Sequence, residues 1–226
     1  MQLKKIQEHI AAYKKWLKNG SQDTETNLYK WESQQIWQKN WDIEATDFAE
    51  MLDQSLQNST SRRIWSRENY APKKAMLEFM KMQPHFVYSM FQELFNEEKD
   101  IRNRIDRFIF YCDELMKEYK TINWASVKTN HYHDYDIISH YLAFQYPDRY
   151  TPYRFLLFKN TLEKIGGKDI PTSNDVTRYF KIMKTLYQFL SKDEELMSLH
   201  QKRLEDKHFQ GTSLLLVEDF ADFLLQ

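Results

Sequence analysis

The stretch HYHDYDIISHYLAFQYPDRYTPYRFLLF, residues His131–Phe158, contains the pattern that decides the fold. In its first half, apolar residues recur at the spacing of a buried helix face, at Ile137, Ile138, Tyr141 and Leu142. Pro147 ends this helix, because proline disfavours helical geometry in the residue before it. Thr151 then reads as an N-cap and Pro152 as a first helical residue, and Gly166 is placed to end the second helix. The stretch predicts two helices joined by an aromatic corner.

The composition of the whole chain agrees with a helical protein. Hydrophobic residues make up 42% of the 226 positions and aromatic residues 15%, which is enough for a substantial core. Only four glycines are present, and such scarcity argues against β-sandwiches and α/β folds, whose turns need glycine. We therefore predict an all-α fold, a compact domain of about ten helices with the aromatic helix–corner–helix at its centre.

Outward from the corner, apolar residues recur at helical spacing over most of the chain. Ser173 is placed to cap one helix, and Ser191 with Glu194 has the spacing of a capping box for the next. The one stretch that could be extended is Leu214–Val217. We predict a single domain over residues 1–226, with a subdivision into 1–120 and 131–226 as the alternative. The apolar ending at Leu225 suggests the N-terminal part of a longer protein, and a last helix docked on the core explains it equally well.

Charge and cysteine content limit the classes of function. The formal net charge is −1, so any binding of nucleic acid must use a local basic patch. Cys112 is the single cysteine, which excludes an intramolecular disulfide. The N-terminus has no apolar signal-peptide core, and no run approaches the roughly 18 apolar residues of a membrane span. We expect a soluble, cytoplasmic protein without a membrane partner.

Motifs for catalysis are weak. The run Gly166–Lys168 lacks the first glycine and the hydroxyl residue of a phosphate-binding loop, and there is no G-x-S-x-G motif. Cys112 lies on the core face of its helix, which favours a packing role. We predict no enzymatic activity and no cofactor.

One cluster resembles a metal site. His133, Asp136 and His140 are spaced i, i+3 and i+7, so they would share one face of a helix, with His131 nearby. A solvated helix start explains the same residues, and no second segment supplies further ligands. They remain weak metal candidates.

Nucleic-acid binding is the stronger functional hypothesis, because cations and aromatic residues alternate between positions 62 and 74. This combination suits phosphate contact together with base stacking. The candidates for phosphate contact are Arg62, Arg63, Lys73 and Lys74, and those for base stacking are Trp65 and Tyr70. The alternative is an ordinary solvated surface with ion pairs.

Four ordered segments carry a family resemblance: KWESQQIWQKNWDIEATDFAEMLDQSL, ENYAPKKAMLEFMKMQP, FVYSMFQELFNEEKDIRNRIDRFIFYCDELMKEY and NHYHDYDIISHYLAFQYPDRYTPYRFLLFKNTLEKIG. From about Trp31 to Phe220 the chain resembles the N-terminal region of bacterial McrB-like AAA+ proteins of modification-dependent restriction systems. The resemblance implies a target-reading domain, followed in the same polypeptide by a GTP-hydrolysing motor that recruits a nuclease subunit. It supplies no functional residues.

The sequence therefore predicts a non-catalytic recognition module of a restriction or defence ATPase that binds DNA, including modified DNA, through a local basic and aromatic face. One alternative is a helical protein-interaction or oligomerisation domain that makes no contact with nucleic acid. Another is a metal-dependent enzyme that uses His131, His133, Asp136 and His140.

Overall fold

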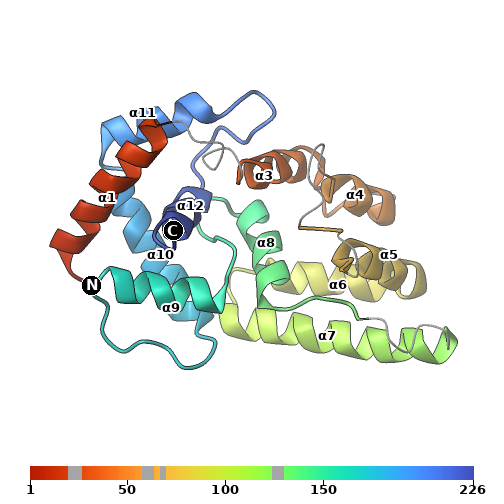
Figure 1. Ribbon diagram of the computed structural model, residues 1–226. Coiled ribbons are helices and arrows are strands. Elements are labelled where there is room, and N and C mark those ends of the chain that lie inside the picture. Colours follow the sequence, from red (N-terminus) through yellow and green to blue (C-terminus); the bar gives the residue numbers. More distant parts are fainter. Residues whose placement is uncertain (20–26, 58–63, 67–69, 124–129) are drawn as a thin grey trace. The chain divides into compact units, whose positions relative to one another are not determined.

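The computed structural model describes residues 1–19, 27–57, 64–66, 70–123 and 130–226. Over these residues it contains eleven α-helices and no β-strand (Figure 1). The prediction of an all-α fold with about ten helices is confirmed. None of these helices combines the length and the apolar character that crossing a membrane would need.

The chain forms two compact units, which we call unit 1 and unit 2. Unit 1 comprises Met1–Glu32 and Tyr146–Gln226, and unit 2 comprises Ser33–Gln145. The helices of unit 1 are α1 (Leu3–Lys18), α9 (Phe155–Lys164), α10 (Val176–Leu190), α11 (Glu194–Arg203) and α12 (Leu215–Phe223). Those of unit 2 are α4 (Phe48–Ser55), α5 (Pro72–Met82), α6 (Pro84–Leu94), α7 (Ile101–Ile122) and α8 (Tyr135–Gln145). Helix α3 (Tyr29–Asn40) has residues in both units.

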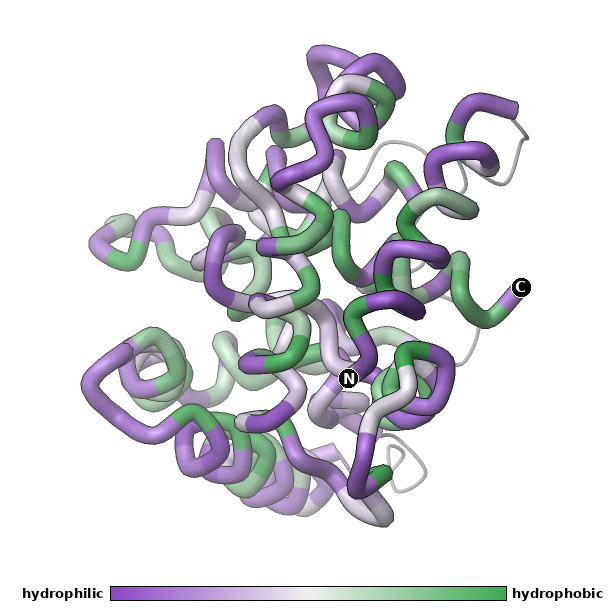
Figure 2. Tube along the Cα trace, turned by 90° about the vertical axis from the view of Figure 1, so that its left-hand side faces the viewer, coloured by the Kyte–Doolittle hydropathy of each residue, from purple (hydrophilic) through white to green (hydrophobic). Residues whose placement is uncertain are grey.

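Aromatic side chains form much of the core of unit 2. Helix α5 packs against α4, α6 and α7, and α7 packs against α8. The ring of Tyr141 in α8 lies 5.4 Å from that of Phe91 and 6.1 Å from that of Phe108. Along individual helices the hydropathy changes from hydrophobic to hydrophilic within a turn (Figure 2). The helical periodicity of the sequence thus places the apolar residues of several helices in one core.

Unit 1 is organised around α12, which packs against α9 and α10. This helix carries buried carboxylates, and each of them meets a cation from elsewhere in the unit. Arg203 pairs with Asp219 at 2.5 Å, and Lys30 pairs with Glu218 at 2.8 Å. Burial alone would raise the pKa of the Asp219 carboxyl, but Arg203 and the Tyr13 hydroxyl outweigh it and lower that pKa. These charges are tolerated inside the unit because each is paired.

The boundaries of the aromatic corner are partly as predicted. Helix α8 ends at Gln145, shortly before Pro147, and Gly166 follows α9 with a left-handed φ of 66°. The predicted start of the second helix at Pro152 is wrong, because α9 begins at Phe155. The carbonyl of Pro152 accepts a hydrogen bond from the Tyr179 hydroxyl. That tertiary bond uses an oxygen that would otherwise accept a bond within the helix.

Three smaller predictions are also wrong. Leu214–Val217 is not extended, since α12 starts at Leu215. A short apolar run of this kind is buried equally well in a helix or a strand, so its periodicity does not decide. The helix caps are aspartates: Asp175 replaces Ser173 for α10, and Asp193 replaces Ser191 for α11.

Candidate functional site

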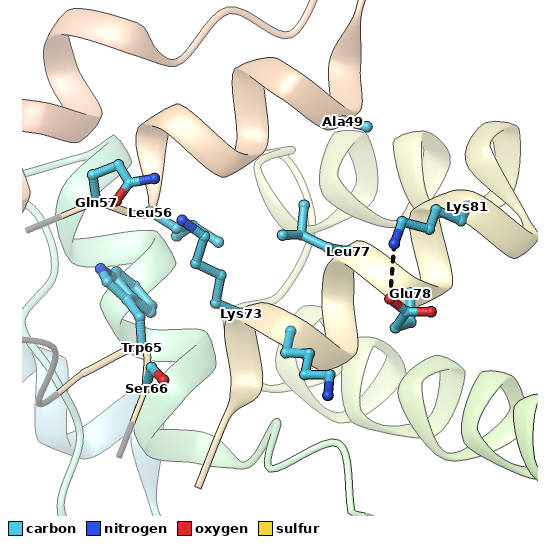
Figure 3. Close-up of a pocket in the computed structure, with 10 residues that line it drawn as sticks. Ala49, Leu56, Gln57, Trp65, Ser66, Lys73, Leu77, Glu78 and Lys81 are labelled. Atoms are coloured by element: carbon cyan, nitrogen blue, oxygen red, sulfur yellow. Dashed lines mark hydrogen bonds and ion pairs between the residues drawn. The ribbon is translucent and has the colours of Figure 1, made fainter. Parts of the chain in front are cut away.

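One surface pocket of unit 2 lies beside α4 and α5, and we call it the α4–α5 pocket (Figure 3). It has a volume of about 510 Å³. Its lining residues are Ala49, Leu56, Gln57, Trp65, Ser66, Lys73, Lys74, Leu77, Glu78 and Lys81. The pocket therefore brings together three of the sequence candidates, Trp65, Lys73 and Lys74.

The residues at the starts of α4 and α5 explain how these two helices form the walls of the α4–α5 pocket. Asp47 caps α4, where its side chain accepts a hydrogen bond from the amide of Glu50 at 2.9 Å. Pro72 occupies the first turn of α5, where its missing N–H has no consequence. Met76 and Phe79 anchor α5 in the core, so its lysines face away from it.

The charges of the pocket are mostly balanced. Figure 3 shows Lys73 reaching from α5 toward the end of α4, where its Nζ lies 2.9 Å from Asp53 Oδ1. Lys81 pairs with Glu78 at 2.9 Å, and this hydrogen bond raises the pKa of Lys81. Lys74 is exposed and has no ion pair with any residue that the structure describes. Among the described lysines that line the pocket, Lys74 is thus the most available to an anionic ligand.

The aromatic candidates differ in how much surface they offer. Trp65 is only 2% exposed, and its ring stacks on Tyr141 at 5.7 Å and 12°. This burial does not favour the base-stacking role predicted for Trp65. Tyr70 is half-buried, with its ring 5.1 Å from that of Tyr132. The phosphate candidates Arg62 and Arg63 lie outside the described residues.

The predicted metal candidates do not form one group. His133 precedes α8, so it does not share a helical face with Asp136 and His140. The Nδ1 atom of His140 lies 2.9 Å from the backbone carbonyl oxygen of Asp136, so it is engaged within α8. His133 instead lies beside Cys112 and His131, and the three ligand atoms are within 4.8 Å of one another. The structure therefore replaces the predicted set with a different one, which we call the Cys–His–His cluster.

Burial keeps two groups of the Cys–His–His cluster, Cys112 and His133, in their uncharged forms. Burial, followed by the nearby charge of Asp113, raises the pKa of the Cys112 thiol well above its usual range. Burial, followed by His131, lowers the pKa of His133 to about 3. The expectation that Cys112 is a buried core residue is confirmed. A neutral imidazole is also the form that binds metal ions.

Sequence reasoning missed Lys81 and Cys112 as site residues. Lys81 lies two turns after Lys74 on α5, so helical spacing from Lys74 could have suggested it. Cys112 gave no such signal, because its partners come from a separate segment near residue 131. Only the packing of α7 against α8 makes that proximity visible.

The fold and these sites define the chain as an all-helical protein with a lysine-lined pocket and a buried Cys–His–His cluster. Comparison with known proteins finds no matching family model, no matching curated protein and no matching solved structure.

Proposed function

We propose that this chain is a non-catalytic recognition module that binds DNA by phosphate contact at the α4–α5 pocket. The observation that carries the proposal is the gathering of Lys73, Lys74 and Lys81 around one pocket of about 510 Å³. The chain has a formal net charge of −1, so a local concentration of cations of this kind is what DNA binding would require.

The three lysines have different roles in this proposal. Lys74 contacts a phosphate directly, because it is exposed and has no described ion pair. Lys81 is 70% exposed at its side chain and exchanges Glu78 for phosphate at little cost, since exposed ion pairs are weak. Lys73 is 16% exposed and holds α5 to Asp53, so it contributes mainly to the local potential.

The role of the module in a larger assembly follows from the resemblance to McrB-like proteins. We propose that it reads targets, including modified DNA, for a motor in the same polypeptide that recruits a nuclease subunit. A modified base would have to be flipped out of the duplex for inspection, which costs a few kcal/mol of unstacking. Tyr70 is the better aromatic candidate for such a base, because Trp65 is buried in the core.

The experiment is fluorescence anisotropy with labelled duplexes that differ only in cytosine modification. We expect Lys74→Ala/Lys81→Ala to weaken binding by about tenfold or more, because two phosphate contacts are lost. The matched control is Lys181→Ala/Lys184→Ala on α10, which removes the same charge from exposed positions. Tighter binding of the modified duplex would support the reading of modified bases. Absent binding, or equal loss in both double variants, would exclude the pocket as a DNA site.

A helical protein-interaction domain is the second candidate, and one observation favours it. Phe86 and Phe110 are 38% and 55% exposed, and both rings pack on Tyr111, at 5.1 and 5.9 Å. Exposed aromatic clusters are typical of interaction surfaces. Phe86→Ser/Phe110→Ser would disrupt self-association or partner binding and leave DNA binding unchanged if this surface serves proteins.

A further inference from the structure

The Cys–His–His cluster in unit 2 has the composition of a metal site. The Sγ of Cys112 from α7 and one ring nitrogen each from His131 and His133 lie within 4.8 Å of one another. Cys112 is fully buried, His133 is 1% exposed and His131 is 7% exposed. Over the residues that the structure describes, no other trio of potential ligands comes this close. A thiolate with two imidazoles is a donor set that suits Zn²⁺.

The backbone between the two histidines adopts an uncommon conformation. Tyr132 has a φ of 62°, in the left-handed region that residues other than glycine rarely occupy. Its amide donates a hydrogen bond to Asn130 Oδ1 at 3.0 Å, which supports the turn. The imidazole rings of His131 and His133 lie face to face, with centroids 5.7 Å apart and planes at 28°. Backbone strain of this kind concentrates at functional sites.

Hydrogen bonds indicate which ring nitrogen of His131 and of His133 would face a bound ion. His131 Nε2 lies 3.0 Å from Asp113 Oδ1, and His133 Nε2 lies 2.9 Å from the Tyr141 hydroxyl. Histidines that bind metals usually have their other nitrogen held in this way by a carboxylate or another polar group. The Nδ1 atoms are therefore the candidates for ligation.

Ligation through the two Nδ1 atoms would also break few existing hydrogen bonds. His133 Nδ1 is buried and has no hydrogen-bond partner in the described part of the chain. A buried polar atom without a partner is costly, and an ion would satisfy it. His131 Nδ1 accepts the amide of His133 at 2.9 Å, so ligation there would exchange one local bond for a metal bond.

We propose that Cys112, His131 and His133 bind one Zn²⁺ ion through Sγ and the two Nδ1 atoms, in a site that ties α7 to the segment before α8. Zinc bonds of about 2.0–2.3 Å place tetrahedral ligands about 3.3–3.8 Å apart, so rotations of the side chains that move each atom by about 1 Å would close the site. This inference is independent of DNA binding, since it uses none of the pocket lysines.

An ion from solution has a short route to the cluster. Asp113 and His131 line a surface pocket of about 570 Å³, together with residues of α7 and Asn130. A water molecule from this pocket would fill the fourth position of a tetrahedral zinc site. Because the three ligands are buried and come from α7 and from the segment before α8, the ion would join these two segments.

The test uses the full chain after chelator treatment, with Co²⁺ as a spectroscopic probe and Zn²⁺ for calorimetry and thermal melting. Cys112 is the only cysteine, so a thiolate-to-Co²⁺ charge-transfer band can arise from no other residue. We expect this band at one Co²⁺ per chain, its loss when Zn²⁺ is added, and a higher melting temperature with Zn²⁺. Cys112→Ser and His133→Gln should each lower the Zn²⁺ affinity by about 100-fold or more.

The matched control is His140→Gln, a buried histidine of the same unit that is not part of the cluster. It should keep the band and the thermal shift. Binding of Zn²⁺ without a thiolate band, or equal affinity in Cys112→Ser, would place the ion on other histidines and overturn the proposal. If a variant does not fold, the band of the unmodified chain alone still decides, since its absence refutes ligation by Cys112.

Discussion

His200 is a buried histidine of unit 1 whose surroundings oppose its protonation. Its ring lies 5.3 Å from that of Trp31, and Arg203 Nε donates a hydrogen bond to its Nδ1 at 3.2 Å. Burial, followed by the charge of Arg203, lowers the pKa of His200 to about 3, although Asp219 acts in the opposite direction. His200 is therefore neutral in the folded chain at physiological pH.

This environment predicts a pH-dependent stability. The folded pKa of His200 is about 3 and the ordinary value is 6.5, so the unfolded chain takes up the proton first as the pH falls. The stability that neutral His200 contributes to the folded chain is complete above pH 6.5 and is lost progressively below it. Between pH 7.5 and 5 we expect the native chain to lose about 2 kcal/mol more of unfolding free energy than His200→Gln does. Urea denaturation of both proteins at both pH values measures this difference. Identical losses of unfolding free energy in the native chain and in His200→Gln would contradict the prediction.

Trp65 illustrates what a residue's neighbours in the sequence do not reveal. Its position among cations favoured an exposed base-stacking role, yet its ring stacks on Tyr141 in the core. Aromatic residues gain most of their stabilisation by burial, and a position beside arginines does not prevent it. The lysines that follow it, Lys73 and Lys74, do line a surface pocket.

At the scale of elements, helix ends depend on single side chains. Ser173 was the predicted cap of α10, but Asp175 Oδ1 accepts the amide of Arg178 at 3.1 Å. Ser173 is exposed and precedes the helix by three residues. Both residues are good N-caps, so composition alone does not choose between them.

The cap of α10 gives a paired prediction. We expect Asp175→Ala to lower the unfolding free energy by about 1 kcal/mol, because the amide of Arg178 loses its acceptor. Ser173→Ala should change it by less than about 0.5 kcal/mol, as surface substitutions usually do. Chemical denaturation of both variants decides, and a larger effect at Ser173 would show that the helix begins earlier in solution.

At the scale of the whole molecule, net charge constrains the proposed DNA contact. A chain with a formal charge of −1 offers no long-range attraction to DNA. The salt dependence of binding should therefore reflect only the number of local phosphate contacts. The magnitude of this salt dependence therefore distinguishes a small basic site from a broad basic face.

The prediction is a modest salt slope. If Lys74 and Lys81 contact phosphates, log K should fall with log salt concentration with a slope of about −2. Lys74→Ala/Lys81→Ala should reduce the magnitude of this slope by about 2, and Lys181→Ala/Lys184→Ala should not change it. Anisotropy titrations at several salt concentrations measure the slope. A much steeper value would require cations beyond the pocket, and a value near zero would exclude phosphate contact.

The fold class could be predicted from the sequence, whereas the residues that make up the candidate sites could be predicted only in part. Apolar spacing correctly indicated helices such as α6 and α10, because each pattern lies within one element. The start of α9 was missed, because a hydrogen bond from Tyr179 to Pro152 depends on a segment more than twenty residues away. The same limitation hid the contact between Cys112 and His133.

The sequence by itself determined that this protein is helical, because helical hydrogen bonds and amphipathic faces depend on residues three or four positions apart. It also determined the single cysteine and the near-neutral charge that restrict its chemistry. Only the tertiary structure decided that Trp65 is buried, that Lys81 joins Lys74 at a pocket, and that Cys112 meets His131 and His133. These meetings depend on how whole helices pack, and that packing is chosen by the sum of many weak contacts between segments distant in the chain.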